Sequence, residues 1–189
     1  MSYSTIKSYA KINLALNIIG KSHAFHKIES IISFIDLNDS ILIKRTNKKF
    51  HKIKFKGTFS KNIYKNNTIS KLFKILEDKN LLDQKKFEVI VTKNIPSKAG
   101  LGGGSMNAAC ILKFFIKKKI IKVSKNQIVN IAKSIGSDVI LGLYLGNLIL
   151  NSKNKIKKFI NCKKIHILIV KPNFGCSTKK IYSGVKSFN

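Results

Sequence analysis

Acidic residues are scarce in this chain of 189 residues: 8 Asp and Glu stand against 37 Lys and Arg, which gives a net charge of +29. Such an excess is typical of proteins that bind nucleic acids, whose backbone is a dense row of phosphates. Arg45 is the only arginine, however, and readers of nucleic acids favour arginine for its planar side chain. The lysines are also scattered rather than gathered in one basic arm. We therefore attribute the charge to a compositional bias toward lysine, asparagine and isoleucine, expect no nucleic-acid partner, and keep nucleic-acid binding as an alternative.

Long hydrophobic runs are missing as well. The longest candidate, residues 139–150, is interrupted by glycines and by Asn147, whereas a helix that spans a bilayer needs about 18 or more apolar residues. The first residues of the chain lack the long uncharged core and the small-residue cleavage site of a signal peptide. We therefore expect a cytoplasmic protein with no membrane partner.

Cysteines are few, and their spacing excludes two common roles. Cys110, Cys162 and Cys176 are odd in number and far apart in the sequence, which argues against both a disulfide framework and a zinc-binding pattern. His23 and His26 form the one close pair of histidines, but no cysteine lies near them in the sequence. We predict no metal-binding residues here.

The pattern of apolar residues predicts strands where it alternates and helices where it recurs every three or four residues. The predicted strands are residues 6–19, 28–35, 40–44, 52–55, 87–92, 143–150 and 165–170. The predicted helices are residues 68–76, 106–118 and 124–135, and a first helical turn is predicted over 178–182. Residues 20–25 are expected to form a loop and residues 36–39 a turn.

A glycine-rich segment joins the predicted strand 87–92 to the predicted helix 106–118. Residues 96–109 read P-S-K-A-G-L-G-G-G-S-M-N-A-A. Glycines allow backbone N–H groups to approach an anion closely, and the start of a helix adds positive potential and free donors. Ser105 is placed either to cap the helix or to offer its hydroxyl to a phosphate. The segment therefore indicates a phosphate-binding loop.

A flexible linker or a tight turn is the alternative interpretation of this segment. The strand before it, the helix after it and the serine at their junction favour phosphate binding. The segment is not a Walker A sequence, because no Lys-Ser or Lys-Thr follows the last glycine. It also lacks the usual Rossmann spacing and an acidic residue about 20 positions later to hold a ribose.

Asp138 is the only carboxylate after Glu88 in the sequence. It lies beside an apolar run and follows Gly136, just after a predicted helix. A carboxylate in a partly buried loop near a phosphate site is a candidate general base. The alternative is a helix-capping or surface aspartate.

Lys11 and Asn13 lie two residues apart in the predicted first strand. Alternate residues of a strand share one face, so these two side chains suit a substrate hydroxyl and a phosphate. In a chain this rich in lysine, Lys11 would carry little weight alone.

Together these segments resemble the GHMP kinases, a family that includes galactokinase, homoserine kinase and mevalonate kinase. The matching motifs are Ala-Lys-Ile-Asn-Leu at 10–14, the glycine-rich run at 96–109 and Gly-Ser-Asp-Val at 136–139. Three glycines followed by Ser-x-Asn-Ala-Ala are most similar to the branch that phosphorylates 4-diphosphocytidyl-2-C-methyl-D-erythritol. Ile140 stands where the family usually has a proline, so the loop at Asp138 is expected to differ in geometry.

The resemblance implies roles for individual residues. Asp138 would be the catalytic base, and Lys11 would keep it ionised and orient the attacking hydroxyl. ATP would be bound by Pro96, Ala99, Gly100, Leu101, Gly102, Gly103, Gly104 and Ser105. The substrate would be bound by Asn13, Phe25, His26, Thr178 and Tyr182. The rings of Phe25 and Tyr182 would lie on the cytosine ring.

The resemblance also implies an α+β fold with a mixed sheet and helices on one face, and ATP and Mg²⁺ as cofactors. It places an ATP-binding N-terminal domain at residues 1–160 and the start of a largely missing C-terminal domain at 161–189. Because that domain carries a further glycine-rich motif and residues 151–159 depart from the family, we expect weak or no activity from this chain alone. A homoserine or mevalonate type of kinase and an inactive remnant are the alternatives.

Overall fold

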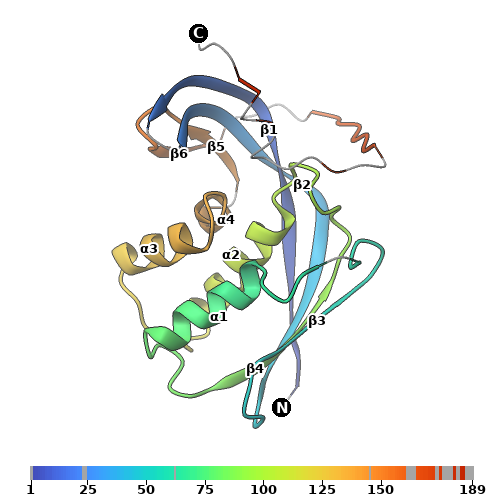
Figure 1. Ribbon diagram of the computed structural model, residues 1–189, viewed down its shortest axis with the longest axis vertical. Coiled ribbons are helices and arrows are strands. Elements are labelled where there is room, and N and C mark those ends of the chain that lie inside the picture. The colour runs from blue at the N-terminus through green and yellow to red at the C-terminus, as the bar shows by residue number, and fades with distance from the viewer. Residues whose placement is uncertain are drawn as a thin grey trace.

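The computed structural model describes residues 2–22, 25–61, 63–144, 146–160, 165–172, 175, 181 and 184–185. A six-stranded sheet forms one layer, and four helices lie against one side of it (Figure 1). The strands are β1 (Ser4–Ser22), β2 (Phe25–Thr46), β3 (Lys52–Lys56), β4 (Lys86–Thr92), β5 (Asn147–Leu150) and β6 (Ile156–Phe159). The helices are α1 (Thr68–Asp78), α2 (Gly103–Lys117), α3 (Lys125–Ile135) and α4 (Val139–Tyr144).

The sheet is mixed, as expected. Five of its strands follow the order β3-β4-β2-β5-β6. The sixth strand, β1, pairs with β2 and is not part of this order. Only β3 and β4 are parallel to each other; the other pairs are antiparallel. The long strand β2 joins the two ends of the sheet, because its residues 40–46 pair with β4 and its residues 30–32 pair with β5.

The core lies between the sheet and the helices. Strand β4 alternates, with Phe87, Val89 and Val91 buried on the helix side. Leu72 of α1 and Phe115 of α2 pack against this face and are fully buried. Helix α1 is capped by Asn67 and helix α3 by Ser124, each in a capping box. The predicted helices thus bury the apolar faces that their spacing indicated.

Three predictions about the N-terminal half are wrong. Strand β2 runs through residues 36–39 without a turn, and a register shift opposite Tyr9 and Ala10 accommodates the polar residues as a bulge. The expected loop 20–25 is wrong at its ends, since residues 20–22 belong to β1 and residue 25 begins β2, with Lys21 paired to His26 and Ser22 to Phe25. Helix α2 begins at Gly103, three residues earlier than predicted, so the last glycines belong to its first turn.

Two predictions about the C-terminal half are also wrong. Residues 143 and 144 end helix α4, so only Asn147–Leu150 form a strand there. Residues 165–170 are exposed and form no strand with the described part of the chain. The turn predicted over 178–182 falls almost wholly outside the described residues. No helix among the described residues combines the length and apolar character that crossing a membrane requires.

Candidate active site

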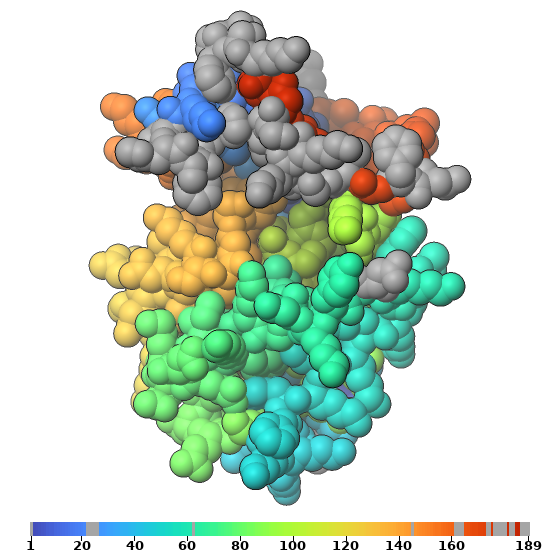
Figure 2. Space-filling model, viewed as in Figure 1, coloured from blue at the N-terminus to red at the C-terminus, as the bar shows by residue number. Residues whose placement is uncertain are grey.

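The glycine-rich segment is a bend between β4 and α2. Gly100 has φ +73° and Gly102 has φ +67°, and both values lie in the left-handed region that favours glycine. Gly102 is the N-cap of α2 and, as a glycine, has no side chain to cap the first N–H groups of the helix. The first N–H groups of α2 therefore face the bend as free donors, at the end of the helix that attracts anions. In Figure 2 the yellow-green residues of this region reach the surface between the orange segment of α3 and α4 and the blue-green residues before α1.

Close contacts explain why the bend needs glycine. A Cβ atom at Gly102 would lie 2.9 Å from Cγ of Lys11, and one at Gly103 would lie 2.9 Å from Cγ2 of Ile95. The backbone N–H of Lys11 donates to the carbonyl of Leu101 at 3.0 Å. The first strand and the glycine-rich bend are thus in direct contact, although they are far apart in the sequence.

Lys11 also reaches Asn13 and Asp138. Its Nζ atom donates to Oδ1 of Asn13 at 2.7 Å and lies 3.5 Å from Oδ2 of Asp138. The Lys11 side chain is only 9% exposed, whereas that of Asp138 is 37% exposed. Asp138 lies between α3 and α4, so its carboxylate faces Lys11 from the opposite side of the site and stays accessible to solvent. Asn13 is held in turn by Ser30, whose Oγ accepts from Asn13 Nδ2 at 2.7 Å.

The remaining residues singled out in the sequence fall into two groups. Leu101 is buried beside Ala10 and Ile95 and anchors the bend, while Pro96, Ala99 and Ser105 are half-buried in the bend and in the first turn of α2. Phe25 and His26 begin β2, but the structure does not describe their side chains. Thr178 and Tyr182 lie outside the described residues. The structure thus brings together Lys11, Asn13, Asp138 and the glycine-rich bend and leaves the proposed cytosine contacts untested.

A second carboxylate beneath the bend was missed by the sequence analysis. Asp39 is fully buried in β2 and accepts hydrogen bonds from Lys93, Asn94, Ile95 and Asn107. The sequence predicts a turn over residues 36–39 because this segment is rich in polar residues. The signal that could have revealed Asp39 is its alternation with Ile41 and Ile43, which places it in line with the core face of the strand.

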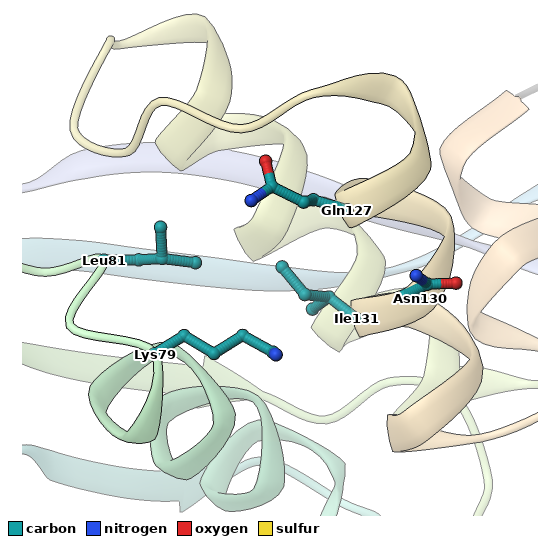
Figure 3. Close-up of a pocket in the computed structure, with 5 residues that line it drawn as sticks. All are labelled: Lys79, Leu81, Gln127, Asn130 and Ile131. Carbon is teal, nitrogen blue, oxygen red and sulfur yellow. The ribbon is translucent and has the colours of Figure 1, made fainter.

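A pocket of about 300 Å³ lies between the end of α1 and α3, lined by Lys79, Leu81, Gln127, Asn130 and Ile131 (Figure 3). None of these residues belongs to the bend or pairs with the side chain of Asp138, whose described partners are Lys11 and Ser137, and the lining of the pocket has no carboxylate. Nor do the described residues contain a group of three or more His, Cys, Asp or Glu side chains close enough to hold a metal ion. The chemistry of the site therefore rests on the bend, Lys11, Asn13 and Asp138.

Comparison with known proteins shows which family the chain resembles. The profile of the GHMP kinases N terminal domain matches residues 67–146. The chain is 63% identical over 189 residues to the 4-diphosphocytidyl-2-C-methyl-D-erythritol kinase of Pelagibacter ubique (strain HTCC1062), covering 100% of this chain and 67% of that protein. It is 34% identical over 182 residues to the protein of the same name from Thermosipho africanus (strain TCF52B), covering 95% of this chain and 63% of the relative.

A solved structure shows the same fold. The crystal structure of a 4-(cytidine 5'-diphospho)-2C-methyl-D-erythritol kinase superposes with a TM-score of 0.66 at 21% identity, over 82% of this chain and 55% of that one. The chain thus spans about two thirds or less of the length of these proteins. Full coverage of this chain at 63% identity decides its family. The chain belongs to the 4-diphosphocytidyl-2-C-methyl-D-erythritol kinases, within the GHMP kinases.

Proposed function

We propose that this chain binds ATP at the glycine-rich bend and transfers the γ-phosphoryl group to the 2-hydroxyl of 4-diphosphocytidyl-2-C-methyl-D-erythritol. The observation that carries the proposal is the position of Lys11. Its side chain packs on Gly102, and its Nζ atom lies 3.5 Å from Oδ2 of Asp138. One side chain therefore spans the distance from the anion-binding bend to the carboxylate.

The bend suits a triphosphate. Its glycines leave no Cβ atoms above the backbone, and the first turn of α2 presents uncapped N–H groups. Mg²⁺ bound with ATP would neutralise charge on the phosphates. Magnesium is held largely by phosphate oxygens and water, with few protein oxygens, so the Ser105 hydroxyl, in the first turn of α2, is the protein group that would fit such an ion.

In this proposal Asp138 accepts the proton of the attacking hydroxyl. Lys11 stabilises the negative charge of Asp138 and, together with Asn13, orients the hydroxyl toward the bend. The amides of the bend and of α2 stabilise the charge on the transferred group. Positioning and electrostatic stabilisation supply most of the rate in phosphoryl transfer, and the site is built from groups that provide both.

The choice of substrate rests on the family. Two relatives that match 95% or more of this chain carry the name 4-diphosphocytidyl-2-C-methyl-D-erythritol kinase. We extend the proposal to Phe25, His26, Thr178 and Tyr182 as contacts of the cytidyl group. We likewise assign residues 1–160 to an ATP-binding domain and residues 161–189 to the start of a second one.

An acceptor panel tests this function. The chain, at high concentration, is incubated with ATP labelled in the γ position and with 4-diphosphocytidyl-2-C-methyl-D-erythritol, homoserine or mevalonate. We expect label only in the cytidyl compound, at a low rate. Label in homoserine or mevalonate would identify another kinase of the family. Tight, salt-sensitive binding of duplex DNA that ATP does not affect would point to the nucleic-acid alternative.

A further inference from the structure

We propose that Asp39 is the positioning residue of the glycine-rich bend: its buried carboxylate ties the residues that enter the bend to the helix that leaves it. Asp39 lies in the middle of β2 and is 0% exposed. Its side-chain hydrogen bonds go to Lys93, Asn94, Ile95 and Asn107 and not to Lys11 or Asp138, so its effect on ATP would be exerted through the bend. The functional part of this inference rests on the proposed binding of ATP there.

The entrance of the bend is held by one carboxylate oxygen. Strand β4 ends at Thr92, and the next backbone N–H groups that turn away from the sheet belong to Asn94 and Ile95. Both donate to Oδ1 of Asp39, at 2.8 and 2.9 Å. These two bonds fix the direction in which the chain leaves β4.

The exit of the bend is held by the other oxygen. Asn107, in the second turn of α2, donates from Nδ2 to Oδ2 of Asp39 at 2.9 Å. Asn107 is 1% exposed, and among the described residues no donor reaches its Oδ1 atom. Its bond to Asp39 is therefore the one hydrogen bond that the Asn107 side chain makes with the described residues. Because the two ends of the bend share a single carboxylate, Gly103 is brought against Ile95, where no Cβ atom would fit.

Lys93 neutralises this carboxylate. Its ammonium group donates to Oδ2 of Asp39, and its side chain is 5% exposed. The same Nζ atom would lie 3.1 Å from a Cβ at Gly103, directly under the first residue of α2. An unpaired buried carboxylate at this place would oppose the attraction of α2 for anions. The ion pair thus supplies the hydrogen bonds of a carboxylate without its net negative charge.

Hydrogen exchange of the backbone amides tests this role without relying on activity. In Asp39→Asn the amide oxygen can still accept from Asn94 and Ile95, but the new NH₂ group faces the donors of Lys93 and Asn107. We expect the hydrogen-bonded amides of Asn94, Ile95 and Met106 to exchange at least about ten-fold faster, and those of α3 to change less than about two-fold. We also expect the Kd for ATP to rise at least about ten-fold.

Two further variants keep the test decisive. Glu88→Gln is the matched control, because Glu88 is also a lysine-paired carboxylate of this sheet, with Lys44 at 3.5 Å; it should leave the bend and the Kd unchanged. Asn107→Leu removes only the exit bond and should accelerate exchange of the Met106 amide, which donates to the carbonyl of Gly102 at 2.9 Å. This variant decides the matter if Asp39→Asn does not fold.

Each outcome has one meaning. Unchanged exchange in the bend, or equal acceleration in the bend and in α3, would overturn the positioning role. If the wild-type chain bound no ATP, the proposed function would fail, while the exchange of the Asn94, Ile95 and Met106 amides would still decide the role of Asp39.

Discussion

Lys11 connects all the parts of the proposed site. Its backbone bonds to Leu101, its side-chain carbons pack on Gly102, and its ammonium group reaches Asp138. Burial restricts this side chain to one arrangement, because only 9% of it is exposed. The ammonium group is thereby fixed at the boundary between the anion-binding bend and the carboxylate, which is the arrangement that transfer of a phosphoryl group to a hydroxyl requires.

Asp138→Asn should abolish proton acceptance while keeping the shape of the side chain. We expect the rate of phosphoryl transfer to fall by about 10²- to 10⁴-fold, with the Kd for ATP unchanged, because the bend is untouched. Single-turnover transfer of labelled phosphate and calorimetry with ATP measure the two quantities. Asp83→Asn, at a carboxylate paired with Lys85, is the control and should keep the wild-type rate. An Asp138→Asn rate equal to wild type would remove Asp138 as the base.

His51 is a buried titratable group outside the site. Its ring stacks on Phe73, its Nδ1 atom accepts from the backbone N–H of Phe87 at 3.0 Å, and its Nε2 atom lies 3.1 Å from Oε1 of Glu77. Burial lowers the pKa of His51 below its ordinary value, and this effect outweighs the opposing attraction of Glu77. The folded protein therefore holds the imidazole neutral at pH values where the unfolded chain protonates it.

The stability of the protein should consequently fall on mild acidification. Below about pH 6.5 the unfolded chain binds a proton at this residue that the folded chain does not, so the free energy of unfolding decreases by up to about 1.4 kcal/mol per pH unit. Glu77 also has a lowered pKa, through its hydrogen bond to Lys86, but it acts below about pH 4.5. Urea unfolding between pH 5 and 7 measures the slope.

His51→Asn should flatten that slope, because asparagine can still accept from Phe87 but does not titrate. His166→Asn, at an exposed histidine, should retain it. A wild-type slope in His51→Asn would show that the loss of stability arises elsewhere.

At the scale of elements, α4 sets the position of Asp138. This short helix begins at Val139 and packs on α2 through Gly142. A Cβ atom at Gly142 would lie 2.6 Å from Cβ of Ala109 and 3.1 Å from Sδ of Met106. The two helices can approach this closely only because Gly142 has no side chain.

Gly142→Ala should therefore separate α4 from α2. We expect a loss of about 1–3 kcal/mol in the free energy of unfolding, as for other overpacked cores, and slower transfer because Asp138 shifts with the helix. Gly136→Ala is the control: its backbone is extended, and its Cβ would meet only Val139, at 3.9 Å. Chemical unfolding of both variants gives the comparison, and equal stabilities would contradict the proposed contact.

Helices and strands whose apolar residues recur with a clear period could be predicted from the sequence. Those that depend on contacts with distant parts of the chain could not. The alternation in β4 and the helical spacing of apolar residues in α1 and α3 are local signals, and they predicted these elements closely. By contrast, residues 36–39 contain polar groups that favour turns, but pairing with β1 and burial of Asp39 keep them in β2. Residues 139–144 are apolar throughout, so helix and strand could not be distinguished there by period.

The candidate site, like the fold, could be predicted where the signal is local in the sequence and could not where it depends on contacts between distant residues. The glycine-rich bend has a sequence signature of its own. The contact of Lys11 with Gly102, in contrast, forms only when β1 pairs with β2 and α2 packs against the sheet. Asp39 was missed because its partners, Lys93 to Ile95 and Asn107, are more than 50 residues away and carry no joint pattern.

At the scale of the whole molecule, the excess of positive charge governs stability. With 37 basic and 8 acidic residues, most lysines have no carboxylate to pair with. Glu88 illustrates the shortage, since it lies within 4.0 Å of Lys44, Lys52 and Lys54. Repulsion among the remaining lysines opposes the compact state.

Added salt should therefore stabilise the protein. Screening at about 0.5 M NaCl shortens the range of charge repulsion well below its value at about 0.02 M, so we expect the Tm to rise across this interval. Thermal unfolding followed by circular dichroism measures it, with sucrose of equal osmolality as the control for solvent exclusion. A Tm that fell with salt would show that attractive pairs outweigh the repulsion.

The central claim is that the backbone of the bend binds the phosphates of ATP beside Lys11 and Asp138. The most direct test is the backbone amide NMR spectrum of the ¹⁵N-labelled chain, recorded while ATP and Mg²⁺ are added. The account predicts that the amides of residues 100–105 shift most and saturate together, while those of α3 stay in place. Shifts confined to the pocket between α1 and α3, or none in residues 100–105 at millimolar ATP, would contradict it.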